Sequence, residues 1–221
     1  MTREEIQIKM VSAKSSISYK KLRKNIFLKD DEKEKISNSI NEMKRLNHFH
    51  AIENKYQIRQ MMFYIKRYRP KVVFIDYAQM MTSEDKSDVK TYQVEDIVKK
   101  LKIIAKQYKC CVVLGCQIDR RNTYKKILEY SMTDFKDSSS YEQVADIGAF
   151  LYWPWYLRRS DTNPETKRRW TEKDKYKSWF LIRKHRYGET ANIPLYFDFI
   201  CGKFGSWSSE EDESIGEEEV I

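Results

Sequence analysis

Two short apolar runs, each ending in a polar side chain, constrain the fold of this chain more than any other feature. The first is residues 71–76 (KVVFID), and the second is residues 110–117 (CCVVLGCQ). Continuous runs rich in Val, Ile and Leu are typical of buried parallel strands. Apolar residues recur at helical spacing over about 94–105, and a strand, helix and strand in this order predict a parallel βαβ unit.

The polar residues at the two strand ends, Asp76 and Gln117, are candidate site residues. Ligands of open α/β sheets collect at the carboxyl ends of the strands. There an Asp can bind water on a Mg²⁺ ion beside nucleotide phosphates, and a Gln can sense the terminal phosphate. The pair indicates a nucleoside triphosphatase. The alternative is that Asp76 only caps the following loop.

The phosphate-binding loop that such an enzyme needs is missing from the 221 residues. No G-x-x-x-x-G-K-[ST] motif occurs, and the single Gly-Lys pair, Gly202-Lys203, has Phe197 where the motif requires its first glycine. The sequence therefore predicts only part of an ATPase.

The remaining pattern alternates helices with strands and then changes to a hairpin. The expected class is α/β, with a mostly parallel sheet flanked by helices and a C-terminal β-hairpin. The further expected elements are a helix opened by a Thr2/Glu5 capping box, a helix at about 31–47, a strand at 48–53, a helix ended by Pro70, a polar loop to 140, a helical turn at 142–145, a strand at 147–152, a charged insertion at about 153–177, and hairpin strands at 179–184 and 192–199.

Charge divides the chain into a basic body and an acidic tail. The net charge is +9, and residues 208–221 hold seven acidic residues and no Lys or Arg, so without this tail the charge rises to +16. A basic body of this kind suits nucleic acid, although solvated lysine-rich helices would give the same count. The expected domains are therefore 1–207 and a disordered acidic tail at 208–221.

Cysteine usage and hydropathy indicate a reducing, cytoplasmic location without a membrane partner. The four cysteines show no C-x-x-C spacing, and three of them lie in or beside the strand at 110–117, so they are expected to be small core residues. No apolar stretch approaches the roughly 18 residues of a membrane span. The three histidines show no ligand spacing, and no metal site is assigned to them.

Four motifs, in a fixed order, resemble those of the DnaB-type replicative helicases. Residues 133–146 (TDFKDSSSYEQVAD) resemble the family loop [ST]-D-[LI]-R-E-S-G-S-I-E-Q-x-A-D. Residues 75–80 (IDYAQM), 116–120 (CQIDR) and 183–188 (RKHRYG) are similar to its I-D-Y-L-Q-L, S-Q-L-N-R and K-Q-R-N-G motifs. The resemblance extends to about residue 207 and implies a RecA-like ATPase domain that uses ATP and Mg²⁺.

The resemblance also implies roles for residues of the motifs at 133–146 and 183–188. In the loop that binds single-stranded DNA, Lys136 stands for the family's Arg, Asp137 for its Glu and Ser139 for its Gly. Lys184 and Arg186 are two residues apart on a strand and so project to one side. The resemblance implies that this cation pair contacts the ATP of a neighbouring subunit in a hexameric ring. The alternative is a solvated basic hairpin.

The aromatic residues at 153–156 could stack on bases, but packing under the adjacent insertion is favoured.

The family's P-loop and catalytic glutamate lie upstream of the region that this chain resembles. Met1-Thr2 matches the start of the helix that follows the glutamate. The expected function is therefore the C-terminal part of a split or truncated viral replicative helicase that moves 5'–3' on single-stranded DNA. A P-loop-bearing N-terminal half would come from another polypeptide, with a primase or loader as candidate partners. Two alternatives remain: an inactive DNA-binding or regulatory ring subunit, and a degenerate partner that lends Lys184 and Arg186 to a complete helicase.

Overall fold

The chain divides into two compact units, each of which is built from separate stretches of sequence. The computed structural model describes residues 2–24, 26–45, 48–54, 57–82, 90–119, 125, 127–135, 138–157, 161–163 and 165–207. The first unit comprises Met1–Glu53, Leu151–Phe180 and Ile193–Ile221, and the second comprises Asn54–Phe150 and Leu181–Asn192.

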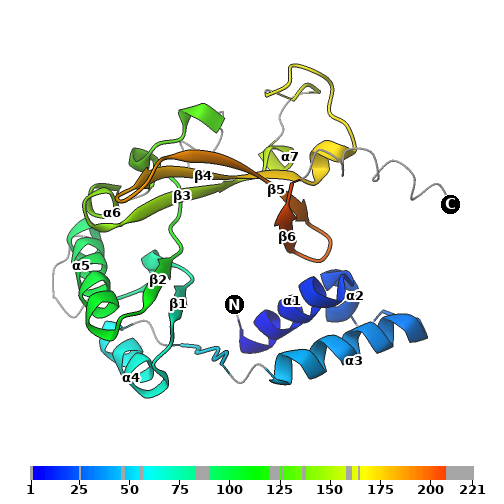
Figure 1. The fold of residues 1–221 in the computed structure, drawn as a ribbon, viewed down its shortest axis with the longest axis horizontal. Coiled ribbons are helices and arrows are strands. Elements are labelled where there is room, and N and C mark those ends of the chain that lie inside the picture. The colour runs from blue at the N-terminus through cyan, green and yellow to red at the C-terminus, as the bar shows by residue number, and fades with distance from the viewer. Residues whose placement is uncertain are drawn as a thin grey trace. The chain divides into compact units, whose positions relative to one another are not determined.

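The second unit contains the predicted βαβ arrangement (Figure 1). Helix α4 (Ile58–Tyr68) leads into strand β1 (Val72–Ile75), and helix α5 (Lys90–Tyr108) connects β1 to β2 (Cys111–Leu114). The two strands are parallel, with Val72 opposite Cys111 and Ile75 opposite Leu114. The prediction of a parallel βαβ unit from the two apolar runs is therefore confirmed.

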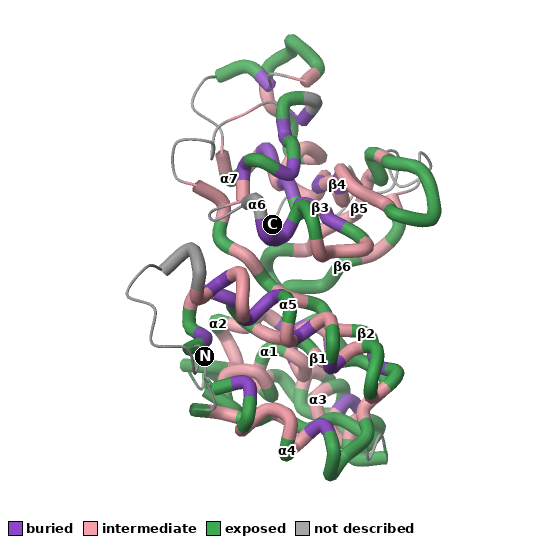
Figure 2. Tube along the Cα trace, turned by 90° about the vertical axis from the view of Figure 1, so that its left-hand side faces the viewer, coloured by how far each residue is buried: buried purple, intermediate pink, exposed green. Residues whose placement is uncertain are grey.

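One face of this two-stranded sheet packs against α4 and α5. Successive side chains of a strand point to opposite faces, and the inward-facing ones are Val73, Ile75, Val112 and Leu114. They contact a core in which Ile97 and Leu101 of α5 are almost fully buried. Buried residues recur along α5, which is purple at several places in Figure 2. Because the two strands are parallel and in register, their carboxyl ends lie at the same edge of the sheet.

The other face of the same sheet is exposed, which corrects the prediction of strands buried on both sides. Val72 is 44% exposed, Phe74 75% and Val113 42%. Cys111 is exposed as well, so the expectation that it is a core residue is wrong, whereas Cys110 and Cys201 are buried. The physical reason is that α4 and α5 both pack on the face that carries Val73 and Leu114.

Beyond β2 the described part of the chain includes 3-10 turns, a short helix and the strands of a second sheet. The elements are η3 (Ile127–Glu129), η4 (Met132–Asp134), α6 (Ser138–Val144), β3 (Ile147–Tyr152), β4 (Lys177–His185), β5 (Ala191–Asp198) and β6 (Lys203–Ser206). The sheet order is β3-β4-β5-β6, and β5 pairs antiparallel with β6. The predicted hairpin is present as β4 and β5, α6 begins four residues earlier than the predicted turn, and β6 was not predicted.

In the first unit, α1 (Arg3–Ser15), α2 (Tyr19–Arg23) and α3 (Asp30–Arg45) follow one another. The Thr2/Glu5 capping box is present and confirms the predicted helix start. The predicted strand at 48–53 is wrong: its described backbone enters neither sheet. No helix within the described part of the chain is long and apolar enough to cross a bilayer.

The aromatic cluster of the first unit packs within the protein, as favoured from the sequence. Trp153, which precedes helix α7 (Pro154–Leu157), lies edge-on to Phe197 with ring centroids 5.0 Å apart. Its ring also stacks on Phe199 at 5.5 Å. The Trp153 Nε1–H donates to the Lys175 carbonyl oxygen at 2.8 Å, which ties the cluster to the 3-10 turn η5 (Lys173–Lys175) of the insertion.

Candidate functional site

The carboxyl ends of β1 and β2 are joined closely by backbone hydrogen bonds. The Gly115 N–H donates to the Ile75 carbonyl at 2.9 Å, and the Ala78 N–H donates to the Gly115 carbonyl at 2.9 Å. A Cβ on Gly115 would lie 3.2 Å from the Ile75 oxygen and 3.8 Å from Asp76 Oδ1. The Asp76 carboxylate therefore lies beside Gly115, which is two residues before Gln117 at the end of β2. Both Asp76 and Gln117 are exposed.

Gln79 links these two strand ends and was not singled out by the sequence analysis. Its Oε1 accepts the backbone N–H of Gln117 at 3.4 Å. Its Nε2 is buried and has no hydrogen-bond partner among the described residues. The available signal was its position in the IDYAQM motif, three residues after Asp76. A buried amide donor without a partner is costly, so this group is poised to bond to a ligand or water at the strand ends.

The strand ends fit a magnesium ion only if a nucleotide supplies ligands too. Mg²⁺ in such sites is held by one or two carboxylates, substrate phosphates and several waters. Asp76 forms no ion pair with another described residue, so its carboxylate is available. Within the described ranges, no group of three or more His, Cys, Asp or Glu side chains could hold a metal. Asp76 thus provides one anchor and not a complete site.

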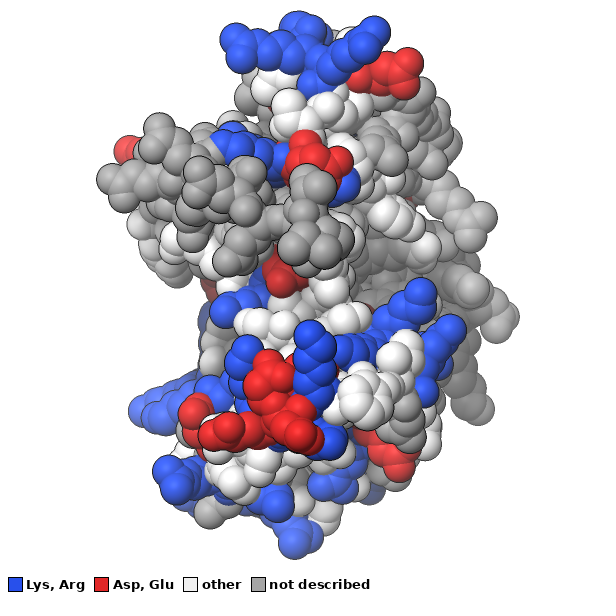
Figure 3. Space-filling view, turned by 90° about the vertical axis from the view of Figure 1, so that its right-hand side faces the viewer, with Lys and Arg blue, Asp and Glu red and all other residues white. Residues whose placement is uncertain are grey.

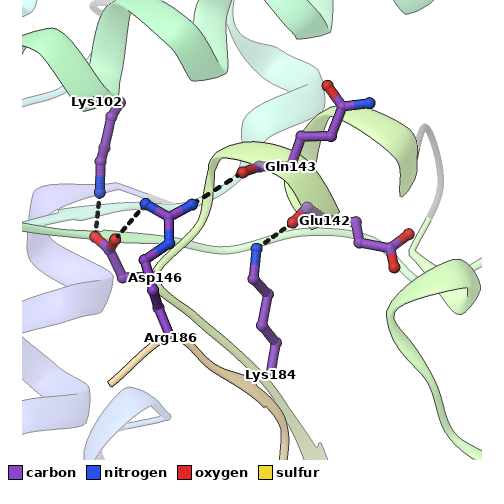
Figure 4. A network of polar contacts seen from close by, with 6 residues as sticks. All are labelled: Lys102, Glu142, Gln143, Asp146, Lys184 and Arg186. Carbon is purple, nitrogen blue, oxygen red and sulfur yellow. Dashed lines mark hydrogen bonds and ion pairs between the residues drawn. The ribbon is translucent and has the colours of Figure 1, made fainter. Parts of the chain in front are cut away.

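Lys184 and Arg186 project to one side of the hairpin, and both reach the carboxyl end of α6 (Figure 4). Lys184 Nζ donates to the Glu142 carbonyl, and Arg186 Nη2 donates to the Gln143 carbonyl at 3.1 Å. Arg186 Nη1 pairs with Asp146 Oδ1 at 3.2 Å. In this structure the cation pair therefore contacts its own chain, whereas the sequence analysis expected it to reach outward.

Asp146 receives a second cation from α5. Lys102 Nζ pairs with Asp146 Oδ2, so the two carboxylate oxygens serve two different basic side chains. The hydrogen bond from Lys102 is the largest cause that holds the pKa of Asp146 below its ordinary value, and the charges of Lys102, Arg186 and Lys106 lower it further. Asp146 is therefore ionised at neutral pH and links α5, α6 and the hairpin within the second unit.

Arg183, next to the cation pair, fastens the hairpin to the turn at 127–130. Its Nε donates to the Tyr130 carbonyl at 2.8 Å and its Nη2 to the Ile127 carbonyl at 2.7 Å, while Nη1 donates to Asn192 Oδ1 at 2.7 Å. Burial lowers the pKa of Arg183 from its ordinary value, but a guanidinium stays charged in proteins. Arg183 is the first residue of the motif at 183–188, but the motif did not predict these hydrogen bonds.

Asp134 is the buried member of the loop motif. Its side chain is almost fully buried, accepts the Ser131 N–H at 2.8 Å and pairs with Lys125 at 2.6 Å. Phe135 beside it stacks on Phe150 with ring centroids 4.3 Å apart. These contacts anchor residues 134 and 135, which precede α6 in the chain.

The residues expected to bind DNA fall largely outside the described part of the chain. Lys136 and Asp137 are not described, and of Ser139 only the backbone, in α6, is. On the face drawn in Figure 3, Lys and Arg side chains lie in several separate groups with Asp and Glu side chains among them. Charge alone therefore does not mark one nucleic-acid surface on that face.

These features define a class of protein and then a family. The parallel βαβ unit, with Asp76 and Gln117 at adjacent strand ends, belongs to a RecA-like α/β fold of the kind found in helicase ATPase domains. Residues 1–206 match the model of the DnaB-like helicase C terminal domain, and the chain belongs to this family. The family resemblance inferred from the four motifs is therefore confirmed.

Relatives and solved structures agree with this assignment. The replicative DNA helicase DnaB of Rickettsia conorii is 26% identical over 216 residues, which are 93% of this chain and 44% of that protein. The DnaB of Mycobacterium leprae is 24% identical over 208 residues, covering 92% of this chain and 32% of that protein. The chain thus spans less than half the length of these relatives.

Two solved structures share the fold over nearly the whole chain. One is a DnaB-like replicative helicase studied for its interactions with primase, with a TM-score of 0.76 and 25% identity over 94% of this chain and 50% of that one. The other is an ATPase domain, with a TM-score of 0.75 and 26% identity over 94% of this chain and 72% of that one.

Proposed function

We propose that this chain is the C-terminal part of a ring-forming replicative helicase that couples ATP hydrolysis to 5'–3' movement on single-stranded DNA. The phosphate cradle, absent from the 221 residues, comes from a P-loop-bearing partner polypeptide. The observation that carries the proposal is the approach of the Asp76 and Gln117 strand ends in a member of the DnaB-like family.

Each candidate residue has a role in this proposal. Asp76 holds Mg²⁺ through a bound water, and the ion neutralises charge that develops on the nucleotide's β- and γ-phosphates. Gln117 senses the terminal phosphate. Lys184 and Arg186 leave the end of α6 and contact the ATP of the next subunit in a hexameric ring. The support for these roles is the match of each residue to a family motif.

DNA contact and partners complete the proposal. Lys136, Asp137 and Ser139 line the path of single-stranded DNA, where a basic side chain forms a salt-sensitive bond to phosphate. The protein acts in the cytoplasm of the cell in which replication occurs, which for a phage is its bacterial host. A primase or a helicase loader is a candidate partner, because one structural neighbour was studied with primase.

The test is complementation of ATP hydrolysis. The chain alone should show no Mg²⁺-dependent turnover above background, and addition of the P-loop-bearing polypeptide with single-stranded DNA should produce it. Asp76→Asn should abolish the recovered activity, and the matched control Asp161→Asn, on an exposed residue of the insertion, should retain it. Robust turnover by the chain alone would contradict the proposal.

An inactive DNA-binding or regulatory ring subunit is the second candidate, and the missing P-loop is the observation that favours it. In that case the chain would bind single-stranded DNA or enter rings of a complete helicase, but no P-loop polypeptide would restore hydrolysis at its own Asp76. A subunit that only lends Lys184 and Arg186 would raise turnover by a complete helicase, and Asp76→Asn would leave that increase unchanged.

A further inference from the structure

Asp146 is the junction at which three elements of the second unit meet. Lys102 comes from α5 and Arg186 from the end of the hairpin, and Asp146 itself lies two residues beyond α6 (Figure 4). The backbone adds a further bond, because the Arg186 N–H donates to the Asp146 carbonyl at 2.8 Å. None of the functional roles proposed above uses Asp146 or Lys102.

The end of α6 attracts cations for a general reason. The last carbonyls of a helix have no partner within it and carry partial negative charge. Lys184 and Arg186 donate to two of these carbonyls, those of Glu142 and Gln143. Both cations are therefore occupied in this structure, and they reach a phosphate elsewhere only if these bonds and the Asp146 pair break.

The geometry points to Asp146 as a positioning residue that couples DNA binding to the placement of the cation pair. This inference rests on the proposed function, in which the segment leading into α6 binds single-stranded DNA and the hairpin contacts ATP. A displacement of α6 by bound DNA moves the carbonyls and the carboxylate that hold Lys184 and Arg186. Asp146 makes the hairpin follow α6, because its charge fixes Arg186 to the helix end and Lys102 fixes both to α5.

Hydrogen exchange on the full chain, in complex with its P-loop-bearing polypeptide, tests this coupling without requiring ATP hydrolysis. Exchange of the backbone amides of 181–192 is measured with and without a saturating oligo(dT). In the wild type, bound oligonucleotide should change exchange of the Arg186 amide by about fivefold or more, the lower end of usual coupling energies. Asp146→Asn should keep oligonucleotide affinity within about twofold. In this variant, bound oligonucleotide should no longer change amide exchange in the hairpin.

Matched variants separate coupling from loss of structure. Asp146→Glu keeps the carboxylate and should restore part of the response. Lys102→Met removes one side of the junction and should reduce the response. Lys99 lies on the same helix, and among the described residues its ion pair is with Glu95, so in Lys99→Met the change in hairpin exchange should equal that of the wild type.

Three results would overturn the inference, and they are distinguishable. If the wild type binds oligo(dT) but its hairpin exchange does not change, only the coupling is wrong. If Asp146→Asn responds as the wild type does, Asp146 is not the positioning residue. If the wild type does not bind oligo(dT) at all, the proposed DNA-binding function fails, and the coupling fails with it.

Discussion

At the scale of single residues, motif positions beside the candidate functional residues hold the local structure together. The Arg183 side chain donates to Tyr130, Ile127 and Asn192 of the second unit, and Asp134 is buried with Lys125 as its ion partner. The sequence predicted that Asp76 and Gln117 follow adjacent strands and that Lys184 and Arg186 project to one side of the hairpin, because strand ends and alternation fix these positions. It did not predict that Arg186 meets Asp146, since this contact joins residues 40 positions apart.

Replacing Arg183 with Met should destabilise the protein by about 1–3 kcal/mol, because the carbonyls of Tyr130 and Ile127 lose their donor in a half-buried environment. Urea unfolding measures the difference in free energy. Arg168→Met is the matched control, since Arg168 is exposed and its substitution should change stability by less than about 0.5 kcal/mol. Equal effects of the two variants would show that the Arg183 bonds do not contribute.

The Asp146 junction should make stability depend on pH in a defined direction. Its pKa is lower in the folded state than the ordinary value, so the charged form stabilises the fold. This contribution is complete above the unfolded-state pKa of about 4 and is lost as the pH falls through the lowered folded-state pKa. Because the groups are partly exposed, we expect at most about 1 kcal/mol.

The measurement is the difference in unfolding free energy between wild type and Asp146→Asn at pH 7 and at pH 3. The wild type should be the more stable at pH 7, and the difference should shrink at pH 3. A difference that is equal at both pH values, or larger at pH 3, would mean that the ionised carboxylate does not stabilise the junction.

At the scale of elements, apolar periodicity predicted the helix and the strands of the βαβ unit. It did not predict that these strands are buried on one face only. The helix over 90–108 and the two parallel strands followed from regular apolar spacing. The run at 110–117 is continuously apolar, so the sequence could not show that Cys111 and Val113 would be exposed while Val112 packs inward. Residues 48–53 have strand-like composition, but a strand needs a partner to bond with. Strand β6 contains Gly205 and is only four residues long, which left no alternation to detect.

The two faces of the β1–β2 sheet should respond differently to substitution. Phe74→Ser lies on the exposed face and should cost less than about 0.5 kcal/mol, whereas Ile97→Ala removes a side chain only 1% exposed and should cost about 2–5 kcal/mol. Denaturant unfolding of both variants provides the comparison. If Phe74→Ser proved as destabilising as Ile97→Ala, the face that carries Phe74 would be covered in the folded chain.

At the scale of the whole molecule, this chain has the fold of a DnaB-like C-terminal domain and lacks the loop that cradles phosphates. Family membership was predictable from four motifs in order, since each fits its strand or loop context. In the proposed ring, the complete site is formed by more than one polypeptide. A P-loop polypeptide and a neighbouring subunit both contribute in the proposed ring, so activity should depend on which subunits meet at an interface.

The most direct test of this account is ATP turnover by a mixture of two inactive variants in the complemented ring. Asp76→Asn removes the Mg²⁺ anchor and Arg186→Ala removes the neighbour's cation, so each alone should be close to background, as a trans arginine contributes roughly 10³-fold or more. In an equal mixture about one interface in four has both groups intact, because each interface takes Asp76 from one subunit and Arg186 from the next. The account predicts partial recovery of turnover on mixing. A mixture that stays at background, or an Arg186→Ala ring that hydrolyses ATP like the wild type, would contradict it.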